Sequence, residues 1–202
     1  MTETASLLDK CIEAALDLAA TRRWQDITLA EIAEKAALSL ADLHGVADKQ
    51  TISEAVESHL DAAMCEGSLD PDETARTRLF DVIMLRFEAM EDRRDGVMSF
   101  LRWRDSSLAG LALRVRARGA TARWALACAG LDRSGQLPPH LQRVGLAWII
   151  AQAERAWRGE TSSDLTATMA ALDGELLKAE SRLEWLSRRG GSSAQADADG
   201  DA

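Results

Sequence analysis

Apolar residues recur every three or four positions along most of this chain, which is the spacing of one face of an α-helix. The clearest runs cover residues 6–22, 50–65, 71–90 and 139–158. The run 71–90 is apolar nearly all round, which predicts a helix through the centre of a domain. Only three prolines occur in 202 residues, and Ala, Leu, Arg and Glu are abundant. These features predict an all-α fold of about nine helices.

The last helix carries the most regular pattern. Its apolar residues step by alternating intervals of four and three: Leu165, Met169, Leu172, Leu176, Ala179, Leu183 and Leu186. This a/d spacing over three heptads predicts a helix that packs lengthwise against other helices. The partner helices belong either to the same chain or to a second copy. Residues 189–202 are small, polar and acidic, and we expect them to form a disordered tail.

Two short helices with capping signals follow the first long helix. Thr28 to Glu31 fits a capping box, and Ser39 to Asp42 repeats the pattern a few residues later. Leu38 lies between the two helices and is expected to insert into the core. A helix, a tight turn and a second capped helix form the outline of a helix-turn-helix, whose second helix enters a DNA major groove.

The order of elements around this outline resembles the N-terminal domain of the TetR/AcrR family of bacterial transcriptional regulators. The resemblance covers roughly the first sixty residues and is carried by Ala14, Ala15, Leu16, Trp24, Thr28, Ile32, Ala33, Ala36, Ser39, Leu43 and Lys49. It implies a helix-turn-helix domain at 1–49 and a helical ligand-binding and dimerisation domain at 50–188. It also implies a ligand-responsive repressor with DNA contacts at Thr28, Ser39, Leu40, Asp42, His44 and Lys49.

The residues that would face DNA depart from the family pattern. Ala37 stands where the family usually has Gly, and Asp42 places a carboxylate in the recognition helix. Residues 1–60 contain eleven acidic and five basic side chains, which gives a net charge of −6. Affinity for DNA comes largely from neutralising phosphates, and this domain has few basic side chains with which to do so. We therefore describe its recognition helix as atypical. We interpret Asp42 as a capping carboxylate at a helix N-terminus rather than as a base reader.

TetR-like proteins dimerise through their final two helices, which here are the helix over 139–158 and the last helix. The resemblance therefore implies a homodimer interface at Trp148, Leu165, Met169, Leu172, Leu176 and Leu183. It also implies a small apolar or lipid ligand in the second domain. Candidate pocket residues are His59, Phe80, Met84, Phe87, Phe100, Trp103, Trp124 and Trp148. The Phe and Met residues of 71–90 are by default core fillers. His59 is either a hydrogen-bonded core histidine, which we favour, or a ligand contact.

A basic stretch interrupts this acidic chain at residues 102–123. Six arginines lie there beside one acid, Asp105, which gives a net charge of +5: Arg102, Arg104, Arg114, Arg116, Arg118 and Arg123. Three interpretations compete. The stretch forms a solvated face that offsets acidic helices, which we favour, or a clamp for an anionic head group, or a membrane-surface patch.

The segment 146–173 is similar to the end of the ubiquinone-biosynthesis accessory family. The similarity consists of a helix, a short Asp/Ser turn and a T-x-x-x-LD start of the last helix. That family has a TetR-like fold, binds isoprenoid lipids and is not thought to read DNA. It implies an alternative function, a TetR-fold protein that binds an apolar lipid or isoprenoid ligand without binding DNA.

Other classes of protein are disfavoured. No stretch approaches the length of a membrane span, and residues 1–10 lack the apolar run of a signal peptide. Cys11, Cys65 and Cys128 are widely spaced and odd in number, as expected of reduced residues in a cytosolic protein. The three histidines lack metal-ligand spacing, and no HExxH, G-x-S-x-G or phosphate-binding glycine loop occurs. We expect a cytoplasmic protein that is not an enzyme and uses no metal or cofactor.

Overall fold

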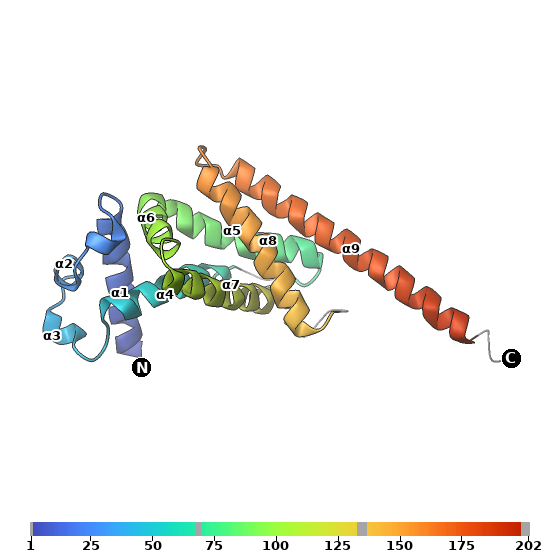
Figure 1. Ribbon diagram of the computed structural model, residues 1–202, viewed down its shortest axis with the longest axis horizontal. Helices are drawn as coiled ribbons and strands as arrows, with labels where there is room; N and C mark the ends of the chain where they lie inside the picture. The colour runs from blue at the N-terminus through green and yellow to red at the C-terminus, as the bar shows by residue number, and fades with distance from the viewer. Residues whose placement is uncertain (1, 68–69, 133–136, 199–202) are drawn as a thin grey trace.

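The computed structural model describes residues 2–67, 70–132 and 137–198, with side chains described from residue 6 to residue 188 within those ranges (Figure 1). The described residues form nine α-helices and two short 3₁₀ helices, and no strand. In chain order these are α1 (Thr2–Ala19), η1 (Trp24–Asp26), α2 (Leu29–Lys35), α3 (Leu40–Leu43), α4 (Lys49–Ala62), η2 (Ala63–Cys65), α5 (Ala75–Asp92), α6 (Arg94–Arg104), α7 (Leu108–Cys128), α8 (Pro139–Gly159) and α9 (Thr166–Ala198). The prediction of an all-α fold is confirmed.

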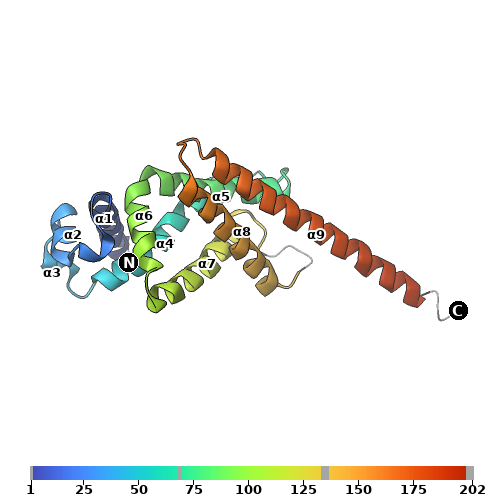
Figure 2. The same ribbon diagram turned by 45° about the horizontal axis from the view of Figure 1, so that its top comes forward.

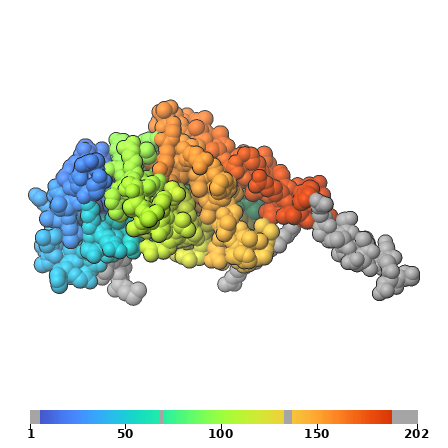
Figure 3. All heavy atoms as spheres, viewed as in Figure 1, coloured from blue at the N-terminus to red at the C-terminus, as the bar shows by residue number. Residues whose placement is uncertain are grey.

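The helices are arranged in three parts along the long axis of the molecule (Figures 1 and 2). The head, made of α1, η1, α2 and α3, lies at one end, where α1 packs against α2, α4 and α6. α4 runs from the head into the body, which consists of α4 to α8. α9 packs along α8 and α5 (Figure 3) and then extends away from the body (Figure 1). The expected boundary at residues 49 and 50 coincides with the start of α4, and the independence of the two domains stays a prediction.

The head folds around the apolar face of α1. Ile12 and Leu16 on that face are fully buried, as the helical spacing predicted. Trp24 of η1 and Ile27 close the same core and are at most 2% exposed. Leu43 of α3 is buried as well, so each element of the head contributes an apolar side chain to one core.

A cluster of three aromatic side chains joins the head to the body. Trp24 of η1 meets Phe100 of α6 edge to face, with ring centroids 4.9 Å apart. Trp103 lies 6.2 Å from Trp24 and 5.9 Å from Phe100. The Trp24 indole also donates a hydrogen bond of 3.1 Å to the Ser53 hydroxyl of α4. Phe100 and Trp103 therefore pack in this junction, and their assignment to a ligand pocket stays a prediction.

α1 and α6 approach each other most closely at Gly96. A Cβ atom at this position would lie 2.1 Å from the backbone oxygen of Leu16, so only glycine fits. Contact between two helix backbones leaves little freedom for either to shift, and it holds the head against the body at a second point.

The apolar seam of α9 divides between two environments. Leu165, Leu172 and Leu176 are at most 4% exposed, because the first half of α9 packs on α8 and α5. Their assignment to a dimer interface was therefore wrong, since they belong to the core of their own chain. Met169 is partly buried against the same core. Leu183 is 37% exposed, and the end of α9 extends away from the other helices (Figure 1).

α9 continues as a helix to Ala198, into the segment 189–202 that was expected to be a disordered tail. That segment contains no proline, so no residue in it blocks the hydrogen bonds of a helix that has already formed. Residues 199–202 lie outside the described residues.

Candidate functional site

Two capping boxes fix the ends of the helix-turn-helix. The Thr28 hydroxyl accepts from the Glu31 amide at 3.3 Å, and the Glu31 carboxylate accepts from the Thr28 amide at 2.8 Å. Ser39 and Asp42 repeat both bonds, at 3.2 and 2.8 Å. Hydrogen bonds from the Ser39 amide and hydroxyl lower the pKa of Asp42. The interpretation of Asp42 as a capping carboxylate is confirmed, and this occupied carboxylate is poorly placed to read a base.

A Schellman motif around Ala37 forms the turn between α2 and α3. The Ala37 amide donates to the Glu34 oxygen at 3.0 Å, and the Leu38 amide donates to the Ala33 oxygen at 2.8 Å. These two bonds define the Schellman motif, which requires a residue with a left-handed backbone conformation. Here that residue is Ala37, with φ of 56°. The Cβ atom of a residue in this conformation costs about 1–2 kcal/mol, which is why glycine is preferred there. Ala37 keeps the geometry of the turn at a cost in stability.

The second helix of the motif is a single turn with an exposed outer side. α3 ends at Leu43, after which His44 adopts an extended backbone and Gly45 reverses the chain with φ of 79°. Leu43 is buried and anchors α3 to the head. Leu40 is 53% exposed, and Ala41 and His44 are also exposed. The surface that α3 can offer to a DNA groove is therefore short and largely uncharged.

The Lys49 side chain is directed into the head. Its ammonium donates to the carbonyl oxygens of Trp24 at 2.7 Å and Gln25 at 3.3 Å, and to that of Ile27. Burial lowers the pKa of Lys49. The assignment of Lys49 to a DNA contact is corrected, because its three N–H groups are used to tie the start of α4 to η1.

Both arginines of the head are paired with acids of the head. Arg22 Nη1 lies 2.5 Å from Glu31 Oε1, and Arg23 Nε lies 2.7 Å from Asp26 Oδ2. The hydrogen bond from Arg22, followed by the one from the Thr28 amide, lowers the pKa of Glu31 to about 2. Glu31 therefore stays ionised and neutralises much of the charge that Arg22 would offer to a phosphate.

The head presents little unpaired positive charge. Lys10 and Lys35 are exposed, and neither forms an ion pair with a described residue. Because Lys49 is turned inward, these two lysines are the basic groups of the head best placed to reach phosphates.

The predicted pocket residues do not come together. Met84 and Phe87 of α5 are buried in the core of the body, whereas Trp124 and Trp148 are 47% and 62% exposed on α7 and α8. Of the eight, Phe80 lines a cleft between α5 and α9. The expectation of an apolar cavity formed jointly by these side chains is therefore not met.

His59 forms a hydrogen bond between α4 and α1. Its Nδ1 lies 3.2 Å from the Asp9 carboxylate of α1, and its ring is partly buried on α4. This agrees with the first of the two interpretations of His59. It also gives α4 a polar contact with the first helix of the head.

The centre of the body is occupied by charged side chains that come from five helices. Arg86 of α5 and Arg104 of α6 are at most 1% exposed, although both carry a charge. We refer to the following residues as the buried ionic cluster: Glu57, Asp61, Arg86, Arg104, Arg118 and Glu154. Ion pairs of this cluster, rather than the predicted pocket residues, therefore occupy the space between these five helices.

Arg86 makes the central contacts of the buried ionic cluster. Its Nη2 lies 2.5 Å from Glu57 Oε2, and its Nε lies 2.7 Å from Asp61 Oδ1. Arg104 also donates to Glu57 and lies 3.3 Å from Glu154 of α8. Two successive turns of α4 are thereby bound to α5, α6 and, through Arg104, to α8.

Arg118 of α7 completes the cluster less well. Its Nη2 donates to Glu154, but its Nη1 is buried without a hydrogen-bond partner among the described residues. Burial, together with the charge of Arg86, lowers the pKa of Arg118 to about 9. Glu154 also accepts from Arg158 at 2.7 Å, so it has more than one partner.

The two acids that α4 contributes respond differently to burial. Burial alone would raise the pKa of Glu57, but the charges of Arg86, Arg104 and Arg118 outweigh it and hold the pKa below its ordinary value. Burial does raise the pKa of Asp61, against the opposing effect of Arg86. Arg86 therefore only partly offsets the burial of the Asp61 carboxylate.

The basic stretch at 102–123 divides between the interior and the surface. Arg104 and Arg118 enter the buried ionic cluster, so the favoured interpretation of a solvated face was wrong for these two. Arg116 lies on the surface, 3.3 Å from Glu54, and Arg123 is exposed. The sequence showed an excess of charge but not which arginines meet acids from other helices.

Sequence reasoning missed the buried ionic cluster, although α4 carried a signal of it. Glu57 and Asp61 are four residues apart and follow Val56 and Leu60, which mark the apolar face of that helix. When acidic residues lie next to the apolar face of one helix and a basic residue lies in an apolar run of another helix, the pattern indicates a buried ion pair between them. Arg86 in the apolar run of α5 is such a residue.

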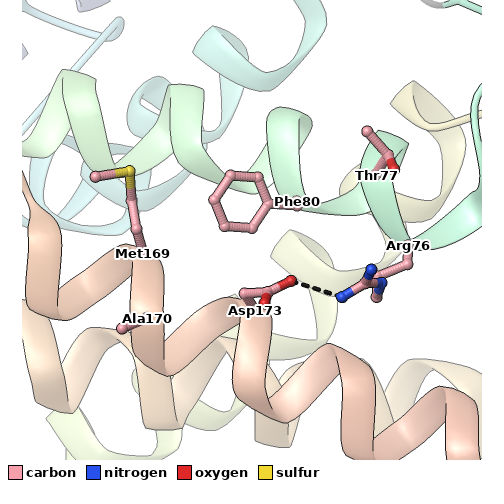
Figure 4. Close-up of a pocket in the computed structure, with 6 residues that line it drawn as sticks. All are labelled: Arg76, Thr77, Phe80, Met169, Ala170 and Asp173. Carbon is pink, nitrogen blue, oxygen red and sulfur yellow. Dashed lines mark hydrogen bonds and ion pairs between the residues drawn. The ribbon is translucent and has the colours of Figure 1, made fainter.

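A small cleft separates α5 from the first half of α9. It has a volume of about 380 Å³ and is lined by Arg76, Thr77, Phe80, Met169, Ala170 and Asp173 (Figure 4). An ion pair of 2.9 Å between Arg76 and Asp173 spans it. The cleft is open to solvent and partly charged, so it does not enclose an apolar ligand.

A row of apolar side chains on α8 is exposed to solvent. Leu141, Val144 and Trp148 follow one another at intervals of three and four residues and are 47 to 68% exposed. Leu183 and Leu186 of α9 are exposed as well. Exposed apolar side chains repeated along a helix face indicate a surface that another protein covers.

Comparison with known proteins identifies the fold. No family model matches the sequence, and no curated protein matches it. Among solved structures, the chain is similar to a TetR transcriptional regulator from Nitrosomonas europaea ATCC 19718, with a TM-score of 0.69 and 20% identity over 88% of this chain and 98% of that chain. The chain therefore has the TetR fold, as the resemblance implied. The similarity to the ubiquinone-biosynthesis accessory family stays a likeness of sequence alone.

None of the helices in the described ranges combines the length and the hydropathy of a membrane span.

Proposed function

We propose that this chain is a TetR-type transcriptional regulator, a dimeric DNA-binding protein of the cytoplasm and not an enzyme. The observation that carries the proposal is the helix-turn-helix itself. Two capped helices are joined by a Schellman turn at Ala37, and the outer side of α3 is exposed. A head kept in this geometry on a TetR fold is suited to place α3 in a major groove.

The head would read DNA mainly by shape and by contacts to bases. Leu40 is exposed on α3 and can contact a thymine methyl group, and His44 follows it at the end of the helix. Thr28 and Ser39, whose hydroxyls cap their helices, lie at the same ends of α2 and α3. With Lys10 and Lys35 as the free basic groups, phosphate contacts contribute less than in a basic head.

A homodimer through α8 and α9 is supported by the exposed apolar side chains on these helices. Trp148 and Leu183 are the members of the predicted interface that remain accessible. Burying exposed apolar surface against a second copy removes it from water, which favours a twofold dimer. Such a dimer carries two heads, which a site with two half-sites requires.

Response to a ligand is supported by the position of α4. This helix begins beside α3 and carries Glu57 and Asp61, which are ion-paired to Arg86 inside the body. A change in the packing of the body therefore displaces α4, and the head with it. The two states of the regulator would differ in the distance between the two copies of α3 in the dimer.

Fluorescence anisotropy against DNA from the region upstream of its own gene tests the proposal. We expect saturable binding that random DNA does not displace. His44→Ala should weaken this binding at least tenfold, and His140→Ala, an exposed histidine on α8, should leave it unchanged. Four free lysines per dimer limit the slope of log K against log salt to about −4.

Absence of binding even at low salt would contradict the proposal. The net charge of −6 over residues 1–60 would then mark the head as a scaffold. In that case the alternative, a TetR-fold protein that binds an apolar lipid or isoprenoid ligand, would be tested by mass spectrometry of molecules that co-purify with the chain.

A further inference from the structure

A cleft rich in arginine lies where the head meets the body. It has a volume of about 480 Å³ and is lined by the end of α1 and the following residues, by one side of α6 and by the end of α8. Asp95 is the one carboxylate among its lining residues. Five lining residues carry guanidinium groups: Arg22, Arg23, Arg94, Arg102 and Arg158. We call this feature the junction cleft, and its lining is strongly basic although the chain has a net charge of −9.

Two of these guanidinium groups are held in place by partners. Arg94 is paired with Glu91 at 2.7 Å and donates to the Trp157 oxygen at 2.9 Å. Arg158 is paired with Asp105 at 2.7 Å. Side chains anchored in this way lose little further freedom when a ligand arrives. They form a rigid wall of the cleft, although the paired carboxylates balance much of their charge.

Arg102 differs from its neighbours in the junction cleft. It is exposed on α6, and no hydrogen bond or ion pair to a described residue uses its guanidinium. Arg23 is engaged through Nε with Asp26, at 2.7 Å. Its two Nη groups form no hydrogen bond with a described residue. Free N–H groups from both the head and the body therefore border one hollow.

We propose that the junction cleft binds a small phosphorylated anion. The guanidinium fork matches the oxygens of a phosphate group, and such charge-assisted pairs are the stronger hydrogen bonds of proteins. The volume falls within the range of about 300–1,000 Å³ that small-molecule sites occupy. Met98, Ala19 and Ala20 supply an apolar side against which a non-phosphate part of the ligand can pack.

The cleft lies between the head and the body, so a bound anion can link the two. Arg23, whose Nη groups are free, belongs to the head, whereas Arg102 belongs to the body. An anion that contacts both arginines ties the head to the body beside Gly96, where α1 and α6 touch. An effect on DNA affinity rests on the proposed function, but binding of the anion does not.

Isothermal titration calorimetry of pyrophosphate and of ADP into the full chain at low salt tests the site. We expect one saturable event per chain for each probe. Tighter binding of ADP indicates a phosphate ester, and equal affinity indicates a free inorganic anion. Arg102→Ala should weaken binding by about tenfold or more, as loss of a charge-assisted hydrogen bond implies. Asp95→Asn should tighten it about two- to fivefold, because a like charge is removed.

Arg123→Ala is the matched control, since Arg123 is exposed on α7 and lies outside the lining of the cleft. It should leave the affinity unchanged. The increase expected from Asp95→Asn cannot be produced by loss of folding, so it separates a binding effect from a structural one. Three results would overturn the site: no saturable heat with either probe, equal weakening by Arg102→Ala and Arg123→Ala, or weaker binding by Asp95→Asn. Each applies whether or not the chain binds DNA.

Discussion

Replacing Arg86 with methionine tests whether the buried ionic cluster holds α4 against the body. Methionine keeps most of the apolar length of the side chain and removes the charge. The change deletes a hydrogen bond of 2.7 Å to Asp61 and one of 2.5 Å to Glu57. Glu57 keeps Arg104 as a partner, but Asp61 is left with the hydroxyl of Thr121 at 2.9 Å.

The expected loss of stability in Arg86→Met follows from the burial of these groups. Removing one partner of a buried ion pair costs about 3–5 kcal/mol, because the remaining charge is uncompensated. This is a large fraction of the roughly 5–15 kcal/mol that stabilises a typical domain. Arg76→Met is the matched control: Arg76 also lies on α5 and also meets two carboxylates, but it is 34% exposed. An exposed pair is worth about 0–1 kcal/mol.

Urea unfolding, followed by circular dichroism at 222 nm, gives the free energy of unfolding of each variant. The double variant Arg86→Met with Asp61→Leu should be more stable than Arg86→Met alone, since it removes the stranded carboxylate. The pH dependence has a definite sign. A carboxyl whose pKa is raised in the fold loses stability as pH rises through that pKa, and without Arg86 the pKa of Asp61 rises further. The free energy of unfolding that Arg86→Met loses should therefore be smaller at pH 5 than at pH 8.

Equal stability losses for Arg86→Met and Arg76→Met would refute this reasoning. So would a double variant that is no more stable than Arg86→Met, because Asp61 would then not be the group left without compensation.

Three further substitutions test other parts of the structure. Ala37→Gly should raise the free energy of unfolding by about 0.5–1 kcal/mol in urea unfolding, because glycine accepts the left-handed turn; a loss of stability would contradict the strain assigned there. Gly96→Ala should lower the thermal unfolding midpoint by several degrees, since its Cβ would lie 2.1 Å from the Leu16 oxygen; an unchanged midpoint would show that α1 and α6 can separate freely. Trp148→Asp should shift the chain from dimer to monomer in analytical ultracentrifugation without changing its circular dichroism, and a dimer that persists would place the interface elsewhere.

The secondary structure of the head could be predicted from local sequence patterns. A capping box involves residues three apart, so Thr28 with Glu31 and Ser39 with Asp42 could be recognised from the sequence. The apolar face of α1 was equally readable, because helical spacing decides which side chains share a face. The order of these elements carried the resemblance to the TetR family, and that resemblance implied the TetR fold.

The partner of a side chain was much harder to predict than its helix. The heptad seam of α9 showed that the helix packs lengthwise, but only the packing on α8 and α5 showed that Leu172 is buried in its own chain and that Leu183 is exposed. Lys49 opens α4 as expected, yet its ammonium reaches carbonyls more than twenty residues earlier in the chain. Spacing along a helix carries no information about which distant group lies opposite.

The interior of the body depended most on the tertiary structure. The sequence by itself determined an all-helical chain with a helix-turn-helix, an acidic head and an excess of arginine at 102–123. Only the tertiary structure decided that Arg86 and Arg104 meet Glu57 in the core, where an apolar cavity was expected. The physical reason is that a buried charge is stable only when an opposite charge from another helix lies beside it, and that proximity is a property of the packed fold.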